Sequence, residues 1–323
     1  MTERPTLTVL GSLNMDISVT VPRLPGPGAT VLGSAARFSP GGKGANQAVA
    51  AARLGAAVRM AGCVGDDDFG RQLLTVLRAE HVDTAAVRTV AGPPTGVALI
   101  TVDQAGENII TVAPGANHQV GPAEVAAALA APAGLLVISA EIPPSVIAQA
   151  LQAPRNPQAP KGPHAILLNL APTPADPHAL LTPDLDWLVV NESEAAAVLG
   201  RSVTGRPEAE LAAIELSARG PRHAVVTSGA AGVAWAGPDG HASIPGFPVE
   251  AKDTVGAGDT FVGALAVALA AGVPTADAMR AAAAAAAASV TRPGAQAAMP
   301  RPADIRAVTG LRWPVVHSDH TEP

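Results

Sequence analysis

Short apolar segments alternate with segments of helical periodicity along most of this chain, and this alternation constrains the fold more than any other feature. Six apolar runs are predicted to be strands buried on both faces: 6–10, 58–63, 135–139, 165–168, 187–190 and 224–227. Helices are predicted at 43–54, 69–80, 123–131, 145–153, 192–199 and 208–218. Strands that alternate with helices form a mostly parallel sheet covered on both faces. The sequence therefore predicts an α/β fold with a doubly wound, mostly parallel sheet flanked by helices.

One region departs from this alternation. The β-type runs 96–102 and 108–113 are separated by five turn-forming residues and predict a hairpin. With runs 17–21 and 31–38 they predict a small separate β-sheet, either a lid over a cleft or an extension of the core. We therefore expect one α/β domain over 1–312, with a discontinuous lid from about 15–40 and 95–114. A solvated loop at 154–163 and a flexible tail at 313–323 complete the prediction.

The composition excludes several classes of protein. A hydrophobic share of 48% excludes a disordered chain, and a single cysteine excludes a disulfide framework or a cysteine-rich metal site. A net charge of −6 without clustered cations argues against a nucleic-acid partner. No signal-peptide pattern is present, and the longest apolar run ends at Pro274, too short to span a membrane. We expect a soluble cytoplasmic protein.

A glycine-containing loop followed by an apolar helix is the strongest chemical motif. Asp253 and Asp259 bracket Gly256, Ala257 and Gly258. Small residues let backbone N–H groups converge at a helix N-terminus, where the helix dipole favours an anion. A carboxylate beside such donors suits phosphoryl transfer, because it can accept the proton of an attacking hydroxyl. An ordinary aspartate cap on a helix is the alternative interpretation, and two acids around the glycines make it less suitable.

A second glycine-rich segment lies at 41–47 and contains Gly41, Gly42, Lys43 and Asn46. Lys43 and Asn46 share one face of a predicted first helical turn. The alternative is a glycine loop entering a helix with a solvated lysine.

Three more polar residues follow predicted strands. Asn14 and Asp16 come after the first strand and point the same way, and Glu141 follows strand 135–139. Ligands of open α/β sheets bind at the carboxyl edge of the strands. With Lys43 and Asn46, these side chains make a donor and acceptor set suited to the hydroxyls of a sugar.

Two weaker segments follow consecutive buried strands and are candidates for binding a nucleotide. One contains Asn191 and Glu194, which could equally be a plain helix cap. The other comprises Thr227, Ser228, Gly229, Ala230, Ala231 and Gly232, which could be an ordinary turn. Their shared position after neighbouring strands favours a common site.

Taken together, the chain resembles the ribokinase-like family of carbohydrate kinases, which includes fructokinases and adenosine kinases. The resemblance covers nearly the whole chain in one order and rests on segments 11–16, 41–47, 62–67, 95–98, 169–172, 191–194, 253–263 and 290–296. It implies a homodimer formed through the lids and ATP-dependent phosphorylation of D-ribose at its 5-hydroxyl. The intact 41–47 motif and the Asn14-x-Asp16 pair are those of the ribose-phosphorylating members.

The resemblance also implies a role for each candidate residue. Asp259 would be the catalytic base, and Gly256, Ala257 and Gly258 would supply the anion hole. Sugar-binding positions would be Asn14, Asp16, Gly41, Gly42, Lys43, Asn46, Glu141 and Asp259. ATP would contact Asn191, the stretch Thr227, Ser228, Gly229, Ala230, Ala231 and Gly232, and Gly258. Glu194 would act indirectly on Mg²⁺.

A monovalent cation site, usually for K⁺, is implied as well. Its ligands would come from Asp253, Val255, Ser289, Arg292 and Gly294, several through backbone carbonyls. The family pattern commonly ends in Gly-Ala-Gln-Pro-Ser, whereas this chain has Ala297 and Ala298 at the last two positions. A hydroxyl that could reach the cation is therefore missing.

Two other functions fit the same motifs. A sibling kinase could act on deoxyribose, fructose or a nucleoside, although four Phe, three Trp and no Tyr offer few aromatic faces for a base. A non-catalytic sugar or nucleotide sensor would have no need for Asp259.

Overall fold

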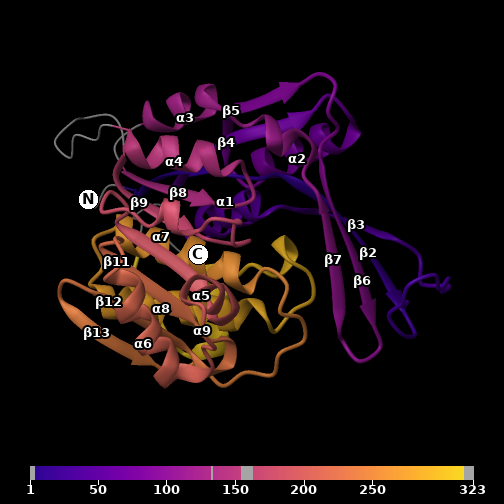
Figure 1. Cartoon of the computed structure of the whole chain (residues 1–323). Helices are drawn as coiled ribbons and strands as arrows, with labels where there is room; N and C mark the ends of the chain where they lie inside the picture. Colours follow the sequence, from indigo (N-terminus) through magenta and orange to yellow (C-terminus); the bar gives the residue numbers. More distant parts are fainter. Residues whose placement is uncertain (1–3, 132–133, 154–162, 316–323) are drawn as a thin grey trace, which may run out of the picture.

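The computed structural model describes residues 4–131, 134–153 and 163–315, and within them a nine-stranded sheet forms the centre of the molecule (Figure 1). Its spatial order is β13 (Gly240–Ile244), β12 (Val233–Gly237), β11 (His223–Thr227), β10 (Trp187–Asn191), β9 (Pro163–Asn169), β8 (Gly134–Ser139), β1 (Thr6–Leu10), β4 (Ala57–Gly65) and β5 (Asp83–Val90). The strands from β11 to β5 are parallel, and β12 and β13 are antiparallel. The predicted α/β fold is confirmed.

Helices cover both faces of this sheet. One face carries α1 (Lys43–Arg53), α2 (Asp68–Ala79), α7 (Ala257–Ala270), α8 (Thr275–Ser289) and α9 (Pro302–Thr309). The other carries α3 (Pro122–Leu129), α4 (Pro144–Gln152), α5 (Glu192–Leu199) and α6 (Gly205–Ser217). Alternate strand residues separate into the two cores, with Val9 on the first face and Leu10 on the second, because side chains alternate along a strand. Both faces therefore require apolar residues, as the sequence pattern indicated.

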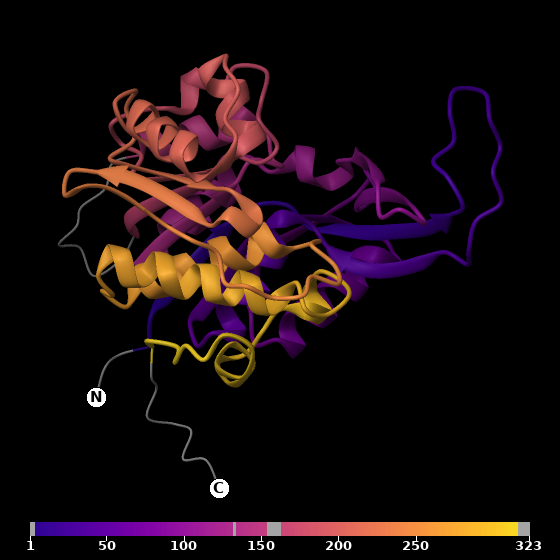
Figure 2. The same ribbon diagram turned by 90° about the horizontal axis from the view of Figure 1, so that it is seen from below.

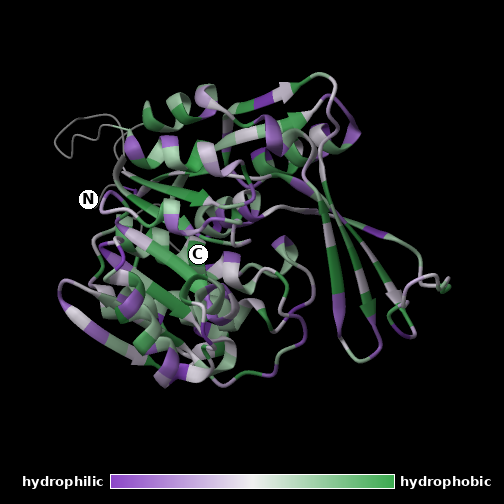
Figure 3. Ribbon diagram, viewed as in Figure 1, coloured by the Kyte–Doolittle hydropathy of each residue, from purple (hydrophilic) through white to green (hydrophobic). Residues whose placement is uncertain are grey.

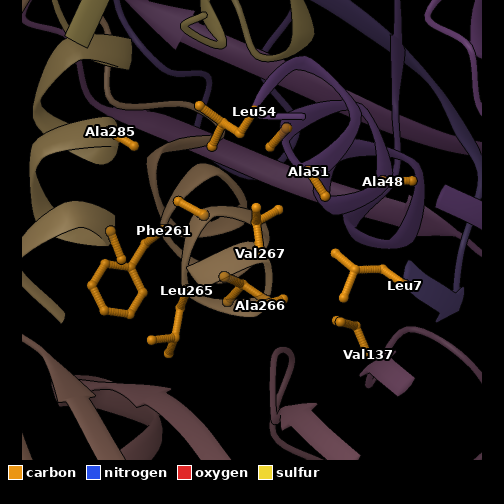
Figure 4. Close-up of a cluster of buried hydrophobic side chains, with 14 of the residues drawn as sticks. Leu7, Ala48, Ala51, Leu54, Val137, Phe261, Leu265, Ala266, Val267 and Ala285 are labelled. Atoms are coloured by element: carbon orange, nitrogen blue, oxygen red, sulfur yellow. The ribbon is translucent and has the colours of Figure 1, made fainter. Parts of the chain in front are cut away.

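The apolar helix α7 lies at the centre of the first core. Figure 4 shows Phe261, Leu265 and Val267 of α7 beside side chains of α1, α8, β1 and β8. Gly263 faces the backbone of α1, where a β-carbon would collide with Gln47 O and Ala50 Cβ. The missing side chain allows α1 and α7 to approach closely, and this approach brings two of the predicted motifs together.

A second sheet extends from one side of the core (Figure 1) and is called the lid below. Its order is β3 (Arg37–Gly41), β2 (Asn14–Val21), β6 (Gly96–Asp103) and β7 (Asn108–Ala113). The predicted strand at 31–38 is wrong in position, since residues 22–36 form a long projecting loop (Figure 2) and the strand runs to Gly41. Pro40 in this strand has no backbone N–H to donate. It is tolerated because β3 lies at the edge of the lid and pairs only with β2.

Several predicted boundaries differ at the ends of the chain and at the sheet edges. Strands β5, β12 and β13 and helix α9 were not predicted from the sequence. The apolar patterns of β5, β13 and α9 are weak, whereas β12 is an apolar and mostly buried run of five residues. Trp313, where the tail was expected to begin, is buried, and its indole N–H donates to Leu54 O at 3.0 Å. Residues 154–162 and 316–323 lie outside the described residues. In the part of the chain that is described, no helix is long and apolar enough to cross a bilayer.

Candidate active site

The candidate residues collect at the carboxyl edge of the parallel strands. Strand β1 lies between β4 and β8. The main sheet therefore grows first on one side of β1, through β4 and β5, and later on its other side, from β8 onward. Such a switch point opens a crevice at the strand ends. Ser12 and Asn14 follow β1, and Glu141 follows β8, so both sides of the crevice carry polar groups.

Glu141 connects the ends of β1, β8 and α1. Its Oε2 accepts a hydrogen bond from Ser12 Oγ at 2.6 Å and from the backbone N–H of Lys43 at 3.1 Å. Asn14 Nδ2 lies 3.4 Å from the same oxygen. Two predicted sugar-binding residues, Asn14 and Lys43, therefore contact the carboxylate of a third, Glu141.

Asp16 is buried in strand β2 on the same face as Asn14. Burial raises the pKa of Asp16 to about 7, the carboxylates of Glu141 and Asp259 add to this effect, and Lys43 opposes it. Gly41 pairs across from this region, and a β-carbon on it would collide with the Asp16 carboxylate. In the lid, the Asp16 carboxyl group thus packs against the backbone of Gly41 and lies close enough to Asp259 for their charges to interact.

Lys43 is the cation among these acids. Burial lowers the pKa of its ammonium, but Asp259, Glu141, Glu194 and Asp16 raise it further, so the pKa lies above its ordinary value. Lys43 follows Gly42, whose φ of 87° requires glycine at the start of α1. A charged ammonium therefore lies between the acids of both predicted binding sets.

Asp259 lies in the first turn of α7 and is 6% exposed. Asn46 Nδ2 donates to its Oδ2 at 2.9 Å, and Gln47 Nε2 donates to its Oδ1 at 3.1 Å. Each carboxylate oxygen can accept more than one hydrogen bond, so a lone pair is left for an incoming hydroxyl. The first and last glycine motifs of the chain therefore meet at this carboxylate.

The first turn of α7 also contains backbone N–H groups that are free to donate to a ligand. The N–H of Ala257 donates to Thr254 O, and that of Thr260 donates to Gly256 O. Among the described residues, no acceptor takes the N–H groups of Gly258 and Asp259. A β-carbon on Gly258 would meet open space, so an anion can approach these two donors.

A cavity of about 230 Å³ links Asp259 to the predicted nucleotide-binding segments. Its lining includes Lys43, Asp259, Asn191, Glu194 and Thr227. Of the stretch 227–232, Thr227 lines this cavity, whereas residues 229–231 form a short 3₁₀ turn beyond it. The cavity therefore extends from the catalytic candidate toward β10 and β11.

Asn191 and Glu194 form a reciprocal cap at the start of α5. Glu194 N–H donates to Asn191 Oδ1, and Asn191 N–H donates to Glu194 Oε2, both at 2.8 Å. The pKa of Glu194 is raised, chiefly by burial and further by Asp259, against the opposing effects of Asn191 and Lys43. A cation in the cavity would stabilise the ionised form of Glu194. The helix cap that was the alternative interpretation is therefore present, and its acidic residue, Glu194, also lines the cavity.

The predicted cation loop is assembled from two distant segments. Asp253 Oδ2 accepts from Gly294 N–H at 2.7 Å, and Asp253 Oδ1 accepts from Val255 N–H at 3.0 Å. Ser289 Oγ donates to Ala286 O. The Arg292 guanidinium is itself a cation and donates to Ala298 O, so only the backbone carbonyl of Arg292 could serve as a ligand.

Sequence reasoning assigned no role to several residues of this region, of which Ser12, Thr254 and Asn117 are examples. Ser12 holds Glu141, Thr254 lines the cavity, and Asn117 donates to Asn14 Oδ1 at 2.7 Å. Ser12 and Thr254 lie inside recognised motifs, which was the available signal. Asn117 is a single amide in a 3₁₀ helix more than a hundred residues from Asn14, and no local pattern indicates its contact.

An acid that can accept a hydroxyl proton, backbone donors for an anion and an adjoining cavity define an enzyme that transfers a phosphoryl group to an alcohol. Comparison with known proteins agrees with this class. The pfkB family of carbohydrate kinases matches residues 4–302, and the chain belongs to this family.

Its relatives include a ribokinase from Bacillus subtilis, 40% identical over 91% of this chain and 96% of the relative. A ribokinase from Haemophilus influenzae is 38% identical over 92% of this chain and 96% of the relative. The structure of an Arabidopsis thaliana ribokinase with ribose and ATP superposes with a TM-score of 0.83 at 29% identity, covering 96% of this chain and all of that one.

Proposed function

We propose that this chain is an ATP-dependent ribokinase that phosphorylates D-ribose at its 5-hydroxyl. One observation carries the proposal: Asp259 contacts Asn46 of the sugar-binding set and lines the cavity of the nucleotide-binding set. A single transfer can therefore link the two substrates. Relatives named as ribokinases and a neighbour solved with ribose and ATP support the choice of substrates.

The transfer follows from the positions of these groups. The 5-hydroxyl oxygen of ribose attacks the γ-phosphorus of ATP, its proton passes to the Asp259 carboxylate, and the bond to the bridging oxygen breaks to release ADP. The N–H groups of Gly258 and Asp259 face the charge that develops on the phosphoryl oxygens. Asn14, Asp16, Lys43, Asn46 and Glu141 hold the other hydroxyls, so the 5-hydroxyl is directed toward Asp259.

Two cations complete the proposal. Mg²⁺ bound with ATP would neutralise phosphate charge, and Glu194 would hold it indirectly from the cavity wall. No group of three or more His, Cys, Asp or Glu is placed to hold a metal ion in the described part of the chain, which fits a metal held mainly by phosphate. K⁺ would take oxygen ligands from Asp253, Val255, Ser289, Arg292 and Gly294. The donor set fits a hard cation, although Ala298 contributes no hydroxyl.

A substrate panel tests this function. ADP release is measured with Mg-ATP and ribose, deoxyribose, fructose or adenosine, each with K⁺ and with Na⁺. We expect ribose to give the highest kcat/KM and K⁺ to increase it. Preference for another sugar would replace the ribose assignment. ADP release that no sugar stimulates, combined with tight sugar binding, would favour a sensor instead.

We also propose that the lid mediates a homodimer. Cα partners across the lid place Asp16, Ala98 and Val112 on one face, and Ile110 lies on that face one pair further out. Ile110 is 50% exposed and Val112 is 42% exposed. Figure 3 shows the lid strands as largely hydrophobic. An apolar face continuous with the sugar-binding residues is a suitable surface for a second copy of the chain.

Sedimentation measures this association. We expect a mass of twice 32.1 kDa for the wild-type chain. Ile110→Asp should yield monomers, because a carboxylate would be buried at the centre of the contact. Leu211→Asp, at an exposed apolar position of α6 outside the lid, is the matched control and should remain dimeric. A monomeric wild-type chain would overturn this part of the proposal.

A further inference from the structure

Four buried amides form a continuous hydrogen-bonded chain around Asp259. Gln296 Nε2 donates to Asn46 Oδ1 at 3.1 Å, and Asn46 Nδ2 donates to Asp259 Oδ2. On the other side, Gln47 Nε2 donates both to Asp259 Oδ1 and to Asn169 Oδ1, the latter at 3.0 Å. The four amides come from the 3₁₀ helix at Gln296–Ala298, α1 and β9, so the chain joins elements more than two hundred residues apart.

The carboxylate determines the direction of every hydrogen bond in this chain. An ionised carboxylate only accepts, so Asn46 and Gln47 must turn their NH₂ groups toward Asp259. Asn46 is then left with its carbonyl toward Gln296, which must donate. Without this donor, the buried Asn46 carbonyl would lose its partner and the amide would be held less firmly against the carboxylate. Gln296 therefore reinforces the orientation in which Asn46 holds the base.

Both glutamines are buried and act as donors. Gln47 is fully buried, Gln296 is 6% exposed, and within the described residues neither Oε1 has a hydrogen-bond partner. A buried unsatisfied carbonyl costs about 1–3 kcal/mol. An apolar residue would avoid that cost, so packing alone does not account for these amides. Their NH₂ groups, which reach Asp259 and Asn46, account for them.

The two ends of the chain are anchored to rigid parts of the fold. Asn169 Nδ2 donates to Val189 O of β10 at 3.3 Å. At the other end, Arg53 donates to Gln296 O at 2.6 Å and pairs with Glu80. The amides thus fix the position of the Asp259 carboxylate relative to the sheet and to α1.

We propose that Gln47 and Gln296 are positioning residues for phosphoryl transfer, Gln47 acting directly on Asp259 and Gln296 acting through Asn46. The inference rests on the proposed role of Asp259 as the base. It assigns the two residues different effects. Gln47 touches the base but no other sugar-binding side chain, whereas Gln296 contacts Asn46, which is both a sugar-binding residue and a partner of the base.

Methionine substitutions test this assignment, because methionine keeps the length of glutamine without its donors. We expect Gln47→Met to lower kcat about 10- to 100-fold, since small misplacement of a catalytic group is costly. Its sugar dissociation constant, measured calorimetrically without ATP, should stay within about threefold of the wild-type value. Gln296→Met should lower kcat and also weaken sugar binding by about three- to tenfold. Gln72→Met, at an exposed position of α2, is the matched control.

A double-mutant comparison separates positioning from general damage to the fold. In the background of Asp259→Asn, the base is gone, so Gln47→Met should cause no further loss of the residual turnover. A similar loss in both backgrounds, or wild-type kcat for Gln47→Met, would overturn the proposal. If Gln47→Met does not fold, Gln47→Asn withdraws the amide from Asp259 by one methylene, and the same comparison decides.

The ribose assignment and this inference fail in different ways. A wild-type chain that prefers another sugar would overturn the former. The ratios for Gln47→Met and Gln296→Met would then be measured with that sugar and would still decide the latter, because the same base serves any acceptor hydroxyl.

Discussion

Replacement of Asp259 by asparagine is expected to reduce turnover by about 10²- to 10⁴-fold, the usual contribution of a general base. The amide cannot accept the hydroxyl proton that the carboxylate receives. Either Asn46 or Gln47 can still donate to the remaining carbonyl oxygen, and the N–H donors of α7 remain in place. The loss should therefore fall on kcat, measured as ADP release at saturating ribose and ATP.

Sugar binding provides the control for this variant. The ribose dissociation constant of Asp259→Asn should change little, because Asn14, Asp16, Lys43 and Glu141 are untouched. Asp259→Ala serves as a second variant, since it avoids turning an NH₂ group against the donors of Asn46 or Gln47. Turnover close to that of the wild-type chain in both variants would remove Asp259 from the role of base.

Asp16→Asn should make the protein more stable at neutral pH and less able to bind ribose. Burial and the neighbouring acids raise the pKa of Asp16 from 3.8 to about 7, so the folded state retains a proton that the unfolded state releases. The contribution of Asp16 to stability is present below about pH 4 and is lost as the pH rises toward 7. A difference of about three pKa units corresponds to as much as about 4 kcal/mol.

Urea unfolding of the two proteins across this pH range measures the effect. The unfolding free energy of Asp16→Asn should exceed that of the wild-type chain at pH 8, and the difference should shrink toward zero near pH 4. Ribose affinity should fall about 10- to 100-fold at pH 8, because a hydrogen bond to a charged acceptor is worth about 1.5–3 kcal/mol. An equally stable variant at pH 8 would contradict the unfavourable burial of this carboxylate.

Local patterns were sufficient for much of the core and for the motifs. Strand β1 and helix α5 have the predicted bounds, because a buried parallel strand needs a continuous apolar run and a helix needs only its own periodicity and cap. The edge strand β3 was misplaced. Its position depends on pairing with β2, and its proline is acceptable only at an edge that the sequence does not reveal.

The sequence by itself determined the layers of the fold and the short segments that carry the chemistry, because these depend on residues close together in the chain. Only the tertiary structure decided that Asn46 and Gln47 lie within hydrogen-bonding distance of Asp259, more than two hundred residues away. That contact depends on the close approach of α1 and α7 at Gly263. Asn117 and Gln296 likewise acquire their roles from distant partners, since an amide has no directional preference until packing places a donor or an acceptor against it.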